Sequence, residues 1–201
     1  MGQNCYFFGT FNPPHRGHIS LARAIKAEFN FDKIIFVPAF CPPHKETLDF
    51  IHRYNMLKLC VDKDLGEVSD IESRLGCPSY TFQTVNYLLN SKKTDNSCVS
   101  SVQIPFIIGY DALIGIKKWK NPEILKEKLE FIVLKRHSGV EKSDIEALSR
   151  EGFRVKPAKT IDYIDVSSNQ IREMVSNKKH ITGLVDDKVR EYIDDKQLYR
   201  I

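Results

Sequence analysis

This sequence lacks the features that mark secreted and membrane-bound proteins. Its five cysteines are odd in number and far apart, and none forms a Cys-x-x-Cys pair, so neither a disulfide framework nor a zinc site is indicated. No apolar run approaches the length of a transmembrane helix, and no charged leader precedes the first apolar residues. We therefore expect a cytoplasmic protein with no membrane partner.

The sequence also lacks a large excess of charge of one sign. Thirty lysines and arginines against 26 aspartates and glutamates leave a net charge of +4. This mild, dispersed charge suits a small anionic substrate and argues against a nucleic-acid partner. Hydrophobic residues make up 42% of the 201 residues, and no internal repeat is present. We expect one globular domain over residues 1–201.

Short apolar runs alternate with segments of helical periodicity along the chain. This alternation predicts an α/β fold, a doubly wound parallel sheet with helices on both faces. Binding sites in such sheets lie at the carboxyl ends of the strands, where the strand order reverses. The expected strands are residues 4–8, 33–38, 68–72, 105–109, 129–135 and 153–156. The expected helices are residues 18–29, 50–62, 80–90, 112–117, 143–150 with Ser143 and Glu146 as a capping box, a helix after Ser168, and 185–195.

The segment GTFNPPHRGH, residues 9–18, joins the first expected strand to the first expected helix. Gly9 permits close approach of the backbone to a ligand, and two prolines keep the connection extended. His15 and His18 then stand three residues apart at the start of the helix, where unpaired N–H groups favour an anion. Imidazoles at this position can donate hydrogen bonds to phosphate oxygens. The segment therefore predicts a nucleotide-phosphate site.

A second segment, DVSSNQIR at residues 165–172, opens an expected helix near the end of the sequence. Ser168 is a favourable N-cap, and Arg172 lies about one turn inside the helix. A hydroxyl, backbone amides and a guanidinium gathered at one point suit phosphate oxygens. Alone, a serine pair before a helix predicts no more than a cap. Together with the histidine segment it indicates a second phosphate contact.

Both segments resemble motifs of the nucleotidyltransferase superfamily of Rossmann-like adenylyltransferases and cytidylyltransferases. The first resembles its His-x-Gly-His signature and the second its Ile-Ser-Ser-Thr-x-x-Arg motif. PPHK at 42–45, PSYTFQT at 78–84, and IIGYD at 107–111 followed by Trp119 resemble the bacterial nicotinate-nucleotide adenylyltransferases over essentially the whole chain. The resemblance implies a Rossmann-like fold and transfer of AMP from ATP to nicotinate mononucleotide, giving deamido-NAD and pyrophosphate.

The resemblance also implies roles for particular residues. Catalytic roles fall to His15, His18, Lys45 and Arg172, with His18 stabilising charge as the α-phosphate is attacked. ATP would be bound by Gly9, Thr10, Phe11, His15, His18, Gly109, Asp111, Ser167, Ser168 and Arg172. Nicotinate mononucleotide would be bound by Lys45, Thr81, Trp119 and Lys120, with the indole stacked on the pyridine ring. Magnesium would arrive on the ATP phosphates, without a cage of protein ligands.

Four positions depart from the family pattern. Phe8 stands where a second glycine is usual, Asn12 where an aspartate is usual, and Asn169 where a threonine is usual. Lys120 stands where an aromatic residue is common, and the neighbours of Trp119 suggest an exposed loop. The choice between the acid and the amide mononucleotide stays open, and so does the oligomeric state, a homo-oligomer included.

The implied chemistry agrees with the residue types. The attacking phosphate oxygen is ionised at neutral pH, so catalysis needs alignment and charge stabilisation rather than a strong base. Three alternatives remain: an adenylyltransferase acting on nicotinamide mononucleotide or phosphopantetheine, a non-catalytic nucleotide sensor on the same fold, and a nucleic-acid-binding protein. The segments at 42–45 and 78–84 speak against phosphopantetheine, the intact phosphate motifs against a sensor, and the mild charge against nucleic acid.

Overall fold

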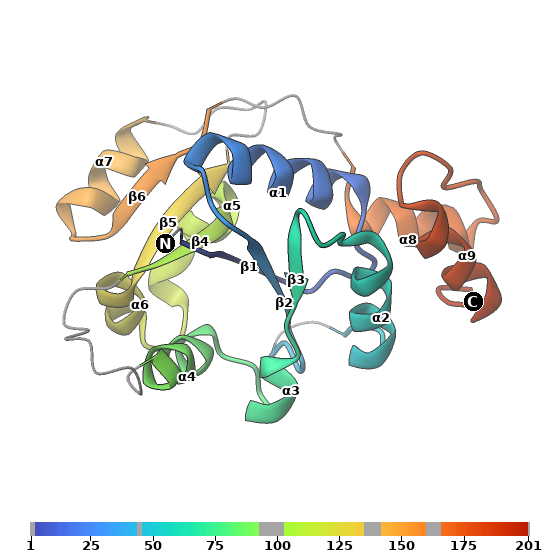
Figure 1. Ribbon diagram of the computed structural model, residues 1–201, viewed down its shortest axis with the longest axis horizontal. Coiled ribbons are helices and arrows are strands. Elements are labelled where there is room, and N and C mark those ends of the chain that lie inside the picture. Colours follow the sequence, from blue (N-terminus) through green and yellow to red (C-terminus); the bar gives the residue numbers. More distant parts are fainter. Residues whose placement is uncertain (1–2, 44–45, 93–102, 135–141, 160–165, 201) are drawn as a thin grey trace.

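A parallel sheet forms the centre of the computed structural model, which describes residues 3–43, 46–92, 103–134, 142–159 and 166–200. Within these residues the sheet has six strands in the order β3-β2-β1-β4-β5-β6, all parallel, and helices cover both faces (Figure 1). The predicted doubly wound α/β fold is confirmed. The strands are β1 (Cys5–Gly9), β2 (Ile34–Pro38), β3 (Gly66–Val68), β4 (Ile104–Gly109), β5 (Leu129–Leu134) and β6 (Arg154–Pro157).

Most of the expected helices are present, with shifted ends. The first begins at Arg16 rather than His18, so both motif histidines lie at its start. The helical elements are α1 (Arg16–Phe29), α2 (Phe50–Cys60), α3 (Ile71–Leu75), α4 (Thr81–Lys92), α5 (Tyr110–Ile114), the 3₁₀ turn η1 (Ile116–Lys118), α6 (Pro122–Lys128), α7 (Lys142–Arg150), α8 (Ser168–Ser176) and α9 (Asp187–Asp195).

Three local predictions are wrong. The strand expected at 68–72 ends at Val68, because the Ser69 hydroxyl accepts the Ile71 N–H at 3.3 Å and the chain turns into α3. The helix expected at 112–117 is broken at Gly115 into α5 and η1. The capping box at Ser143 is absent from the described residues, since α7 already includes Lys142.

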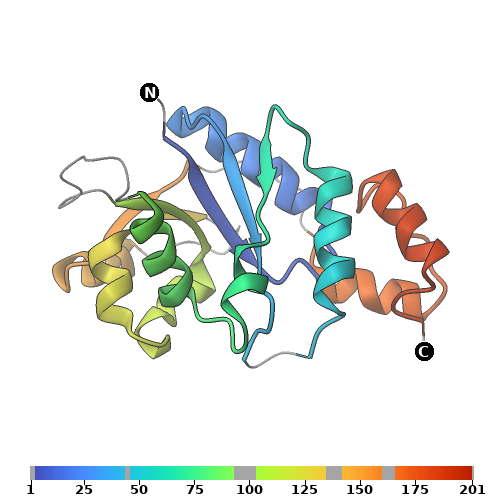
Figure 2. The ribbon, with the colours of Figure 1, turned by 60° about the horizontal axis from the view of Figure 1, so that its bottom comes forward.

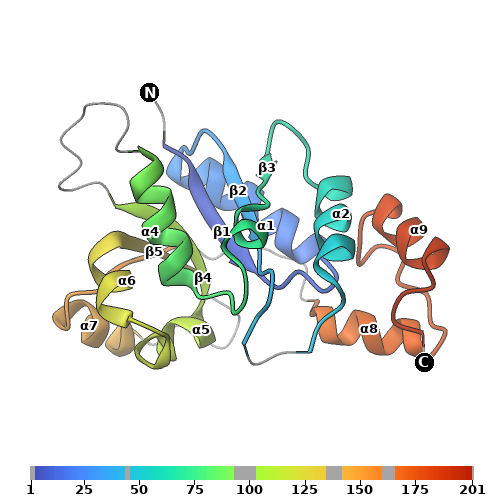
Figure 3. The same cartoon turned by 90° about the horizontal axis from the view of Figure 1, so that it is seen from below.

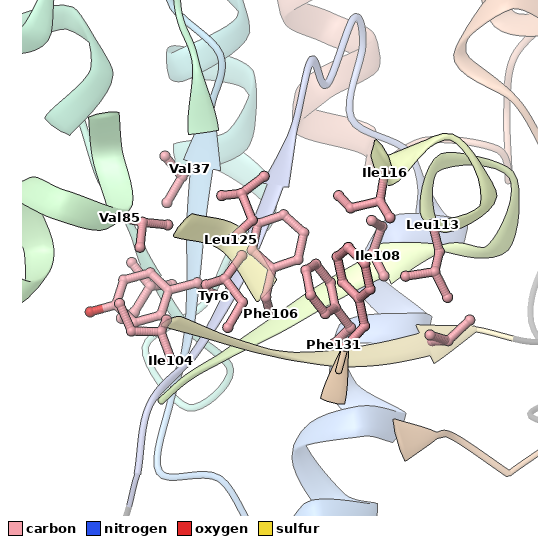
Figure 4. Close-up of a cluster of buried hydrophobic side chains, with 14 of the residues drawn as sticks. Tyr6, Val37, Val85, Ile104, Phe106, Ile108, Leu113, Ile116, Leu125 and Phe131 are labelled. Carbon is pink, nitrogen blue, oxygen red and sulfur yellow. The ribbon is translucent and has the colours of Figure 1, made fainter. Parts of the chain in front are cut away.

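Side chains alternate between the two faces of each strand, so the sheet separates two apolar clusters. Tyr6 packs on one face, in a cluster that reaches α3, α4, α5 and α6 (Figure 4). Its neighbours Cys5 and Phe7 pack on the other face, against α1 and the end of α2. Seen from below, α4 and α6 lie in front of the strands and α1 lies behind them (Figure 3).

A third apolar cluster holds the last two helices against α2 at one end of the molecule (Figure 2). Met56 of α2 meets Ile171 and Val175 of α8 and Val189 and Ile193 of α9 in this cluster. The packing carries the second phosphate-motif segment to the edge of the sheet where β1 ends. No helix in the described part of the chain combines the length and apolar character needed to cross a membrane.

Candidate active site

The carboxyl ends of β1 and β4 lie side by side where the strand order reverses. β1 ends at Gly9 and β4 ends at Gly109. The register pairs Phe7 with Ile107, and continued by two residues it places Gly9 level with Gly109. A Cβ added to Gly109 would meet no described atom within 4 Å, so the backbone here leaves room for a ligand. This is the position where parallel α/β sheets bind ligands.

His15 and His18 cap the start of α1 together. The Nδ1 atom of His15 accepts the His18 backbone N–H at 3.3 Å, and Nδ1 of His18 accepts the His15 backbone N–H at 3.2 Å. The two rings stack with their centroids 3.6 Å apart. Because both Nδ1 atoms accept hydrogen bonds, each neutral ring carries its proton on Nε2. The cap therefore fixes the tautomer of both imidazoles as an Nε2–H donor.

The first backbone N–H groups of α1 are less free than the sequence analysis expects. The Arg16 N–H donates to the Leu184 carbonyl at 2.8 Å, and the Arg16 Nε–H donates to the Val185 carbonyl at 3.2 Å. The His18 N–H is shared between Nδ1 and the carbonyl of His15. An anion site built from unpaired amides is therefore a wrong prediction at these two residues. The imidazoles, rather than these amides, are the donors suited to a phosphate at this turn.

Phe11 orients the His18 ring from within the core. Its backbone has a positive φ of 51°, and its side chain is 2% exposed. The Phe11 ring meets the His18 ring edge-on with centroids 5.0 Å apart, and meets Phe7 in the same way at 5.3 Å. A Cβ on Gly9 would lie 2.9 Å from the Phe11 ring, so only glycine leaves space for it. The Phe11 side chain thus acts on the site through His18.

The loop between β1 and α1 is held by donors from distant parts of the chain. Three backbone carbonyls of the loop each accept one side-chain hydrogen bond. The pairs are Arg53 Nη1 to the Thr10 carbonyl at 2.9 Å, Arg172 Nη1 to the Asn12 carbonyl at 2.8 Å, and the Ser168 hydroxyl to the Pro13 carbonyl at 2.8 Å. The two phosphate-motif segments of the sequence therefore meet in the fold.

Asn12 is bound by a tyrosine near the far end of the sequence. The Tyr199 hydroxyl donates to Oδ1 of Asn12 at 2.7 Å across 187 residues of sequence. Asn12 is 7% exposed, and burial raises the pKa of Tyr199, which keeps the hydroxyl protonated as a donor. The side chain at the position where an aspartate is usual in the family therefore anchors the loop.

The second segment starts one residue earlier than predicted. Ser167, not Ser168, is the N-cap of α8, and its hydroxyl accepts the Gln170 N–H at 3.1 Å. Ser168 is the first helical residue, and its hydroxyl donates to the Pro13 carbonyl of the loop between β1 and α1. Arg172 lies one turn further, where its second terminal nitrogen donates to Asn169 Oδ1 at 2.8 Å. Two of the five Arg172 N–H groups are thus bound within the protein.

Trp119 and the start of α4 with Thr81, which are expected around the mononucleotide, lie on the opposite face of the sheet from α1. Thr81 begins α4, and Trp119 follows η1. Trp119 is half-buried rather than exposed, and its indole meets the Phe106 ring edge-on with centroids 6.4 Å apart. Lys120 is exposed, whereas Lys45 lies outside the described residues. Trp119 and α4 pack on the same apolar cluster, but no contact joins Trp119 directly to Thr81 among the described interactions.

The remaining predicted ATP residue outside the loops is Asp111. It lies in the first turn of α5, just after Gly109, and its side chain is exposed at the same end of the sheet. Among the described residues, no group of three or more histidine, cysteine, aspartate or glutamate side chains is placed to hold a metal ion.

A buried network of charged side chains, which the sequence analysis missed, supports the loop after β2. Arg53 of α2 is 0% exposed and donates to the carbonyls of Thr10, Leu48 and Phe40. Glu72 of α3 is 4% exposed and accepts the Phe40 N–H at 3.1 Å. Burial lowers the pKa of Arg53 and raises that of Glu72, and the opposite charges partly offset both shifts. The Phe40 peptide group is thus held from both sides.

The network also reaches the start of α4. Glu72 accepts a hydrogen bond from the buried Thr84 hydroxyl at 3.1 Å. One signal in the sequence could have revealed Arg53, because it stands three and four residues before the apolar Met56 and Leu57 and so shares their buried helix face. Through Arg53 and Glu72, the loop between β1 and α1, the loop after β2 and helix α4 form one connected unit.

Comparison with known proteins agrees with this architecture. A family model described as cytidylyltransferase-like matches residues 6–174. Two solved structures of the Plasmodium falciparum nicotinic acid mononucleotide adenylyltransferase share the fold. The complex with NaAD has a TM-score of 0.79 at 20% identity and covers 99% of this chain and 98% of that one, and the complex with APC has a TM-score of 0.76 at 19% identity with the same coverage. The chain belongs to the cytidylyltransferase-like family.

The sequence relatives narrow the family further. The chain is 33% identical over 202 residues to the nicotinate-nucleotide adenylyltransferase of Bacillus subtilis (strain 168), with 96% of both chains covered. It is 35% identical over 199 residues to a Caldicellulosiruptor saccharolyticus protein named "Probable nicotinate-nucleotide adenylyltransferase", with 96% of this chain and 97% of the relative covered. Within its family, the chain is a member of the nicotinate-nucleotide adenylyltransferases.

Proposed function

We propose that this protein transfers AMP from ATP to nicotinate mononucleotide, forming nicotinate adenine dinucleotide and releasing pyrophosphate, as a step of NAD biosynthesis. The observation that carries the proposal is the His15–His18 pair, whose mutual capping presents two imidazole donors at the carboxyl end of β1. The membership of the chain in the nicotinate-nucleotide adenylyltransferases supports the choice of substrates.

The reaction forms one bond and breaks another at the α-phosphorus of ATP. A phosphate oxygen of the mononucleotide attacks, and the bond to the pyrophosphate oxygen breaks. The nucleophile is already ionised, so His15 and His18 serve to align and stabilise charge rather than to remove a proton. In this mechanism His18 donates to the α-phosphate, and its orientation depends on Phe11.

The departing pyrophosphate collects negative charge, which needs donors at the edge of the site. Arg172 supplies these donors through the N–H groups that the Asn12 carbonyl and Asn169 do not use. Ser167 and Ser168 contribute the start of α8, whose dipole favours an anion. Magnesium would enter bound to the ATP phosphates as part of the substrate and would neutralise part of the same charge.

The remaining assignments follow the position of each residue. Gly109 and Asp111 would border the adenosine ribose at the end of β4. Trp119 would stack on the pyridine ring, with Thr81 and Lys120 near the nicotinate carboxylate and Lys45 near the phosphate of the mononucleotide. A soluble, cytoplasmic enzyme working on small anionic nucleotides would suit the mild positive charge of the chain.

Pyrophosphate release in the presence of ATP and magnesium tests the proposal directly. Nicotinate mononucleotide, nicotinamide mononucleotide and phosphopantetheine are compared at equal concentrations with one enzyme preparation. We expect a strong preference for the nicotinate form. A preference for the amide would keep the chemistry and replace the substrate, whereas no release with any of the three would overturn the proposal.

A further inference from the structure

Two cysteines that are far apart in the sequence line one surface groove beside the proposed mononucleotide residues. Cys41 lies in the loop after β2, and Cys77 lies between α3 and α4. Both residues line the same surface groove, and interaction with the Cys41 thiol raises the pKa of Cys77. Cys77 is exposed and Cys41 is half-buried, so the pair is open to a small reagent.

Hydrogen bonds hold together the two segments that contain the cysteines. The Ser79 N–H donates to the Cys41 carbonyl at 2.9 Å, and the Cys41 N–H donates to the Ser79 hydroxyl at 2.9 Å. Phe40, the residue before Cys41, is fixed by Arg53 and Glu72 as described above. The two cysteines are therefore held near each other by a hydrogen-bonded pair of segments and not by two free loops.

The other described cysteines have different surroundings. Cys5 is fully buried in the core, where burial raises its pKa strongly. Cys60 is half-buried on α2, burial raises its pKa to about 12, and its thiol faces the Leu57 carbonyl at 3.5 Å. Neither contacts a second cysteine among the described interactions. Of the described thiols, only Cys41 and Cys77 share a groove and have access from solvent.

We propose that Cys41 and Cys77 form a reversible dithiol–disulfide site that responds to low-molecular-weight disulfides. A Cys77 thiolate attacks one sulfur of the small disulfide RSSR, which forms a mixed disulfide and releases one RS⁻. The Cys41 thiolate then attacks the Cys77 sulfur, which forms the Cys41–Cys77 bond and releases the second RS⁻. The protein loses two electrons and two protons, and RSSR becomes two RSH.

Oxidation should act on the mononucleotide side of the site, and this part rests on the proposed function. A disulfide fixes the two sulfurs at about 2.05 Å, closer than two unbonded thiols can approach each other. The bond would therefore displace the segment that leads to Lys45 relative to the segment that leads to Thr81. A misplacement of about 1 Å in such a region can lower a rate by as much as about 10²-fold. We expect kcat/KM for nicotinate mononucleotide to fall at least tenfold on oxidation, and to recover on reduction.

The protein is incubated with graded ratios of oxidised to reduced glutathione at mildly alkaline pH, because interaction with Cys41 raises the pKa of Cys77. Free thiols are then counted, and a non-reducing digest is mapped by mass spectrometry. We expect the thiol count to fall by two and one cross-linked peptide pair to contain Cys41 and Cys77. A cross-link to Cys98, or no cross-link, overturns the site.

Three single variants sharpen the result. Cys77→Ser should abolish the cross-link, Cys41→Ser should leave Cys77 trapped as a mixed disulfide, and Cys60→Ser is the matched control that should behave like the unsubstituted protein. A Cys41–Cys77 cross-link without a change in kcat/KM overturns the effect on activity. If the reduced enzyme releases no pyrophosphate with any substrate, the proposed function fails, while the thiol count still tests the disulfide site by itself.

Discussion

The backbone amides of His15 and His18 are each bound by the other residue's imidazole Nδ1, so one reciprocal pair both starts α1 and aims two Nε2–H groups. The Nδ1 side of each ring therefore caps the helix, and the Nε2 side is the one proposed to bind phosphate. A substitution at either histidine tests both properties at once, unless it keeps the cap and removes only the Nε2–H group.

His18→Asn makes that separation. The asparagine Oδ1 can still accept the His15 N–H, but the side chain is too short to replace the Nε2–H donor. We expect kcat to fall about 10²–10³-fold, the usual cost of losing one well-placed donor to a developing charge. The KM for ATP and the melting temperature should change little. His180→Asn, at an exposed histidine, serves as the control, and near-normal turnover of His18→Asn would sink the assigned mechanism.

Trp119→Ala should chiefly raise KM for nicotinate mononucleotide. Stacking of a base on an aromatic side chain is worth about 1–3 kcal/mol, which corresponds to roughly a 5- to 150-fold change in KM. Because the indole also contacts Phe106, Trp119→Phe and the melting temperatures separate lost stacking from lost packing. Steady-state kinetics with each substrate varied in turn provide the measurement. An effect confined to ATP would move Trp119 out of the pyridine pocket.

Arg53→Met should destabilise the protein more than any exposed substitution. Three partly buried carbonyls would lose their donor, and each group left unsatisfied costs about 1–3 kcal/mol when it is buried. We expect the free energy of unfolding in urea to fall by about 3 kcal/mol or more. Arg74→Met, on the exposed side of α3, should leave the free energy of unfolding nearly unchanged. Equal losses for the two variants would contradict the bracing role of Arg53.

Glu72→Gln should change how stability depends on pH. Burial raises the pKa of Glu72 above its ordinary value of 4.5 in the folded protein. The contribution of this group to stability is therefore complete below pH 4.5 and declines as pH rises through the folded pKa. Glutamine does not titrate, so the stability of the unsubstituted protein relative to the variant should fall from that pH toward neutrality. Urea unfolding at a series of pH values measures this difference, and a rise with pH would falsify the prediction.

Features of the fold and site that depend on neighbouring residues could be predicted from the sequence. Apolar periodicity predicts the parallel sheet, and the spacing of His15 and His18 after Gly9 predicts a loop at the end of β1. The histidine cap could not be predicted in the same way, because histidine is not among the usual N-cap residues. The confusion of Ser167 with Ser168 reflects a boundary that local sequence fixes only to within a residue or two.

Long-range bonds were beyond sequence reasoning. Nothing near Asn12 indicates that Tyr199 binds it, and nothing near Phe40 indicates that Arg53 and Glu72 meet there. The strand expected at 68–72 failed for a related reason, since the Ser69 hydroxyl bound a backbone amide and redirected the chain. These details depend on which elements the tertiary fold brings together, and only the structure supplies them.

The hydrogen bond between Tyr199 and Asn12 can form only after all the residues between them have been synthesised. Asn12 leaves the ribosome early, but its partner lies 187 residues later. At a synthesis rate of about 5–20 residues per second, the loop waits roughly ten to forty seconds for the hydroxyl that anchors it. During that interval the nascent chain can assemble the strands and α1, but the loop between β1 and α1 still lacks its bond to Tyr199. A chain interrupted before Tyr199 would thus hold all six described strands and lack this anchor of the loop between β1 and α1.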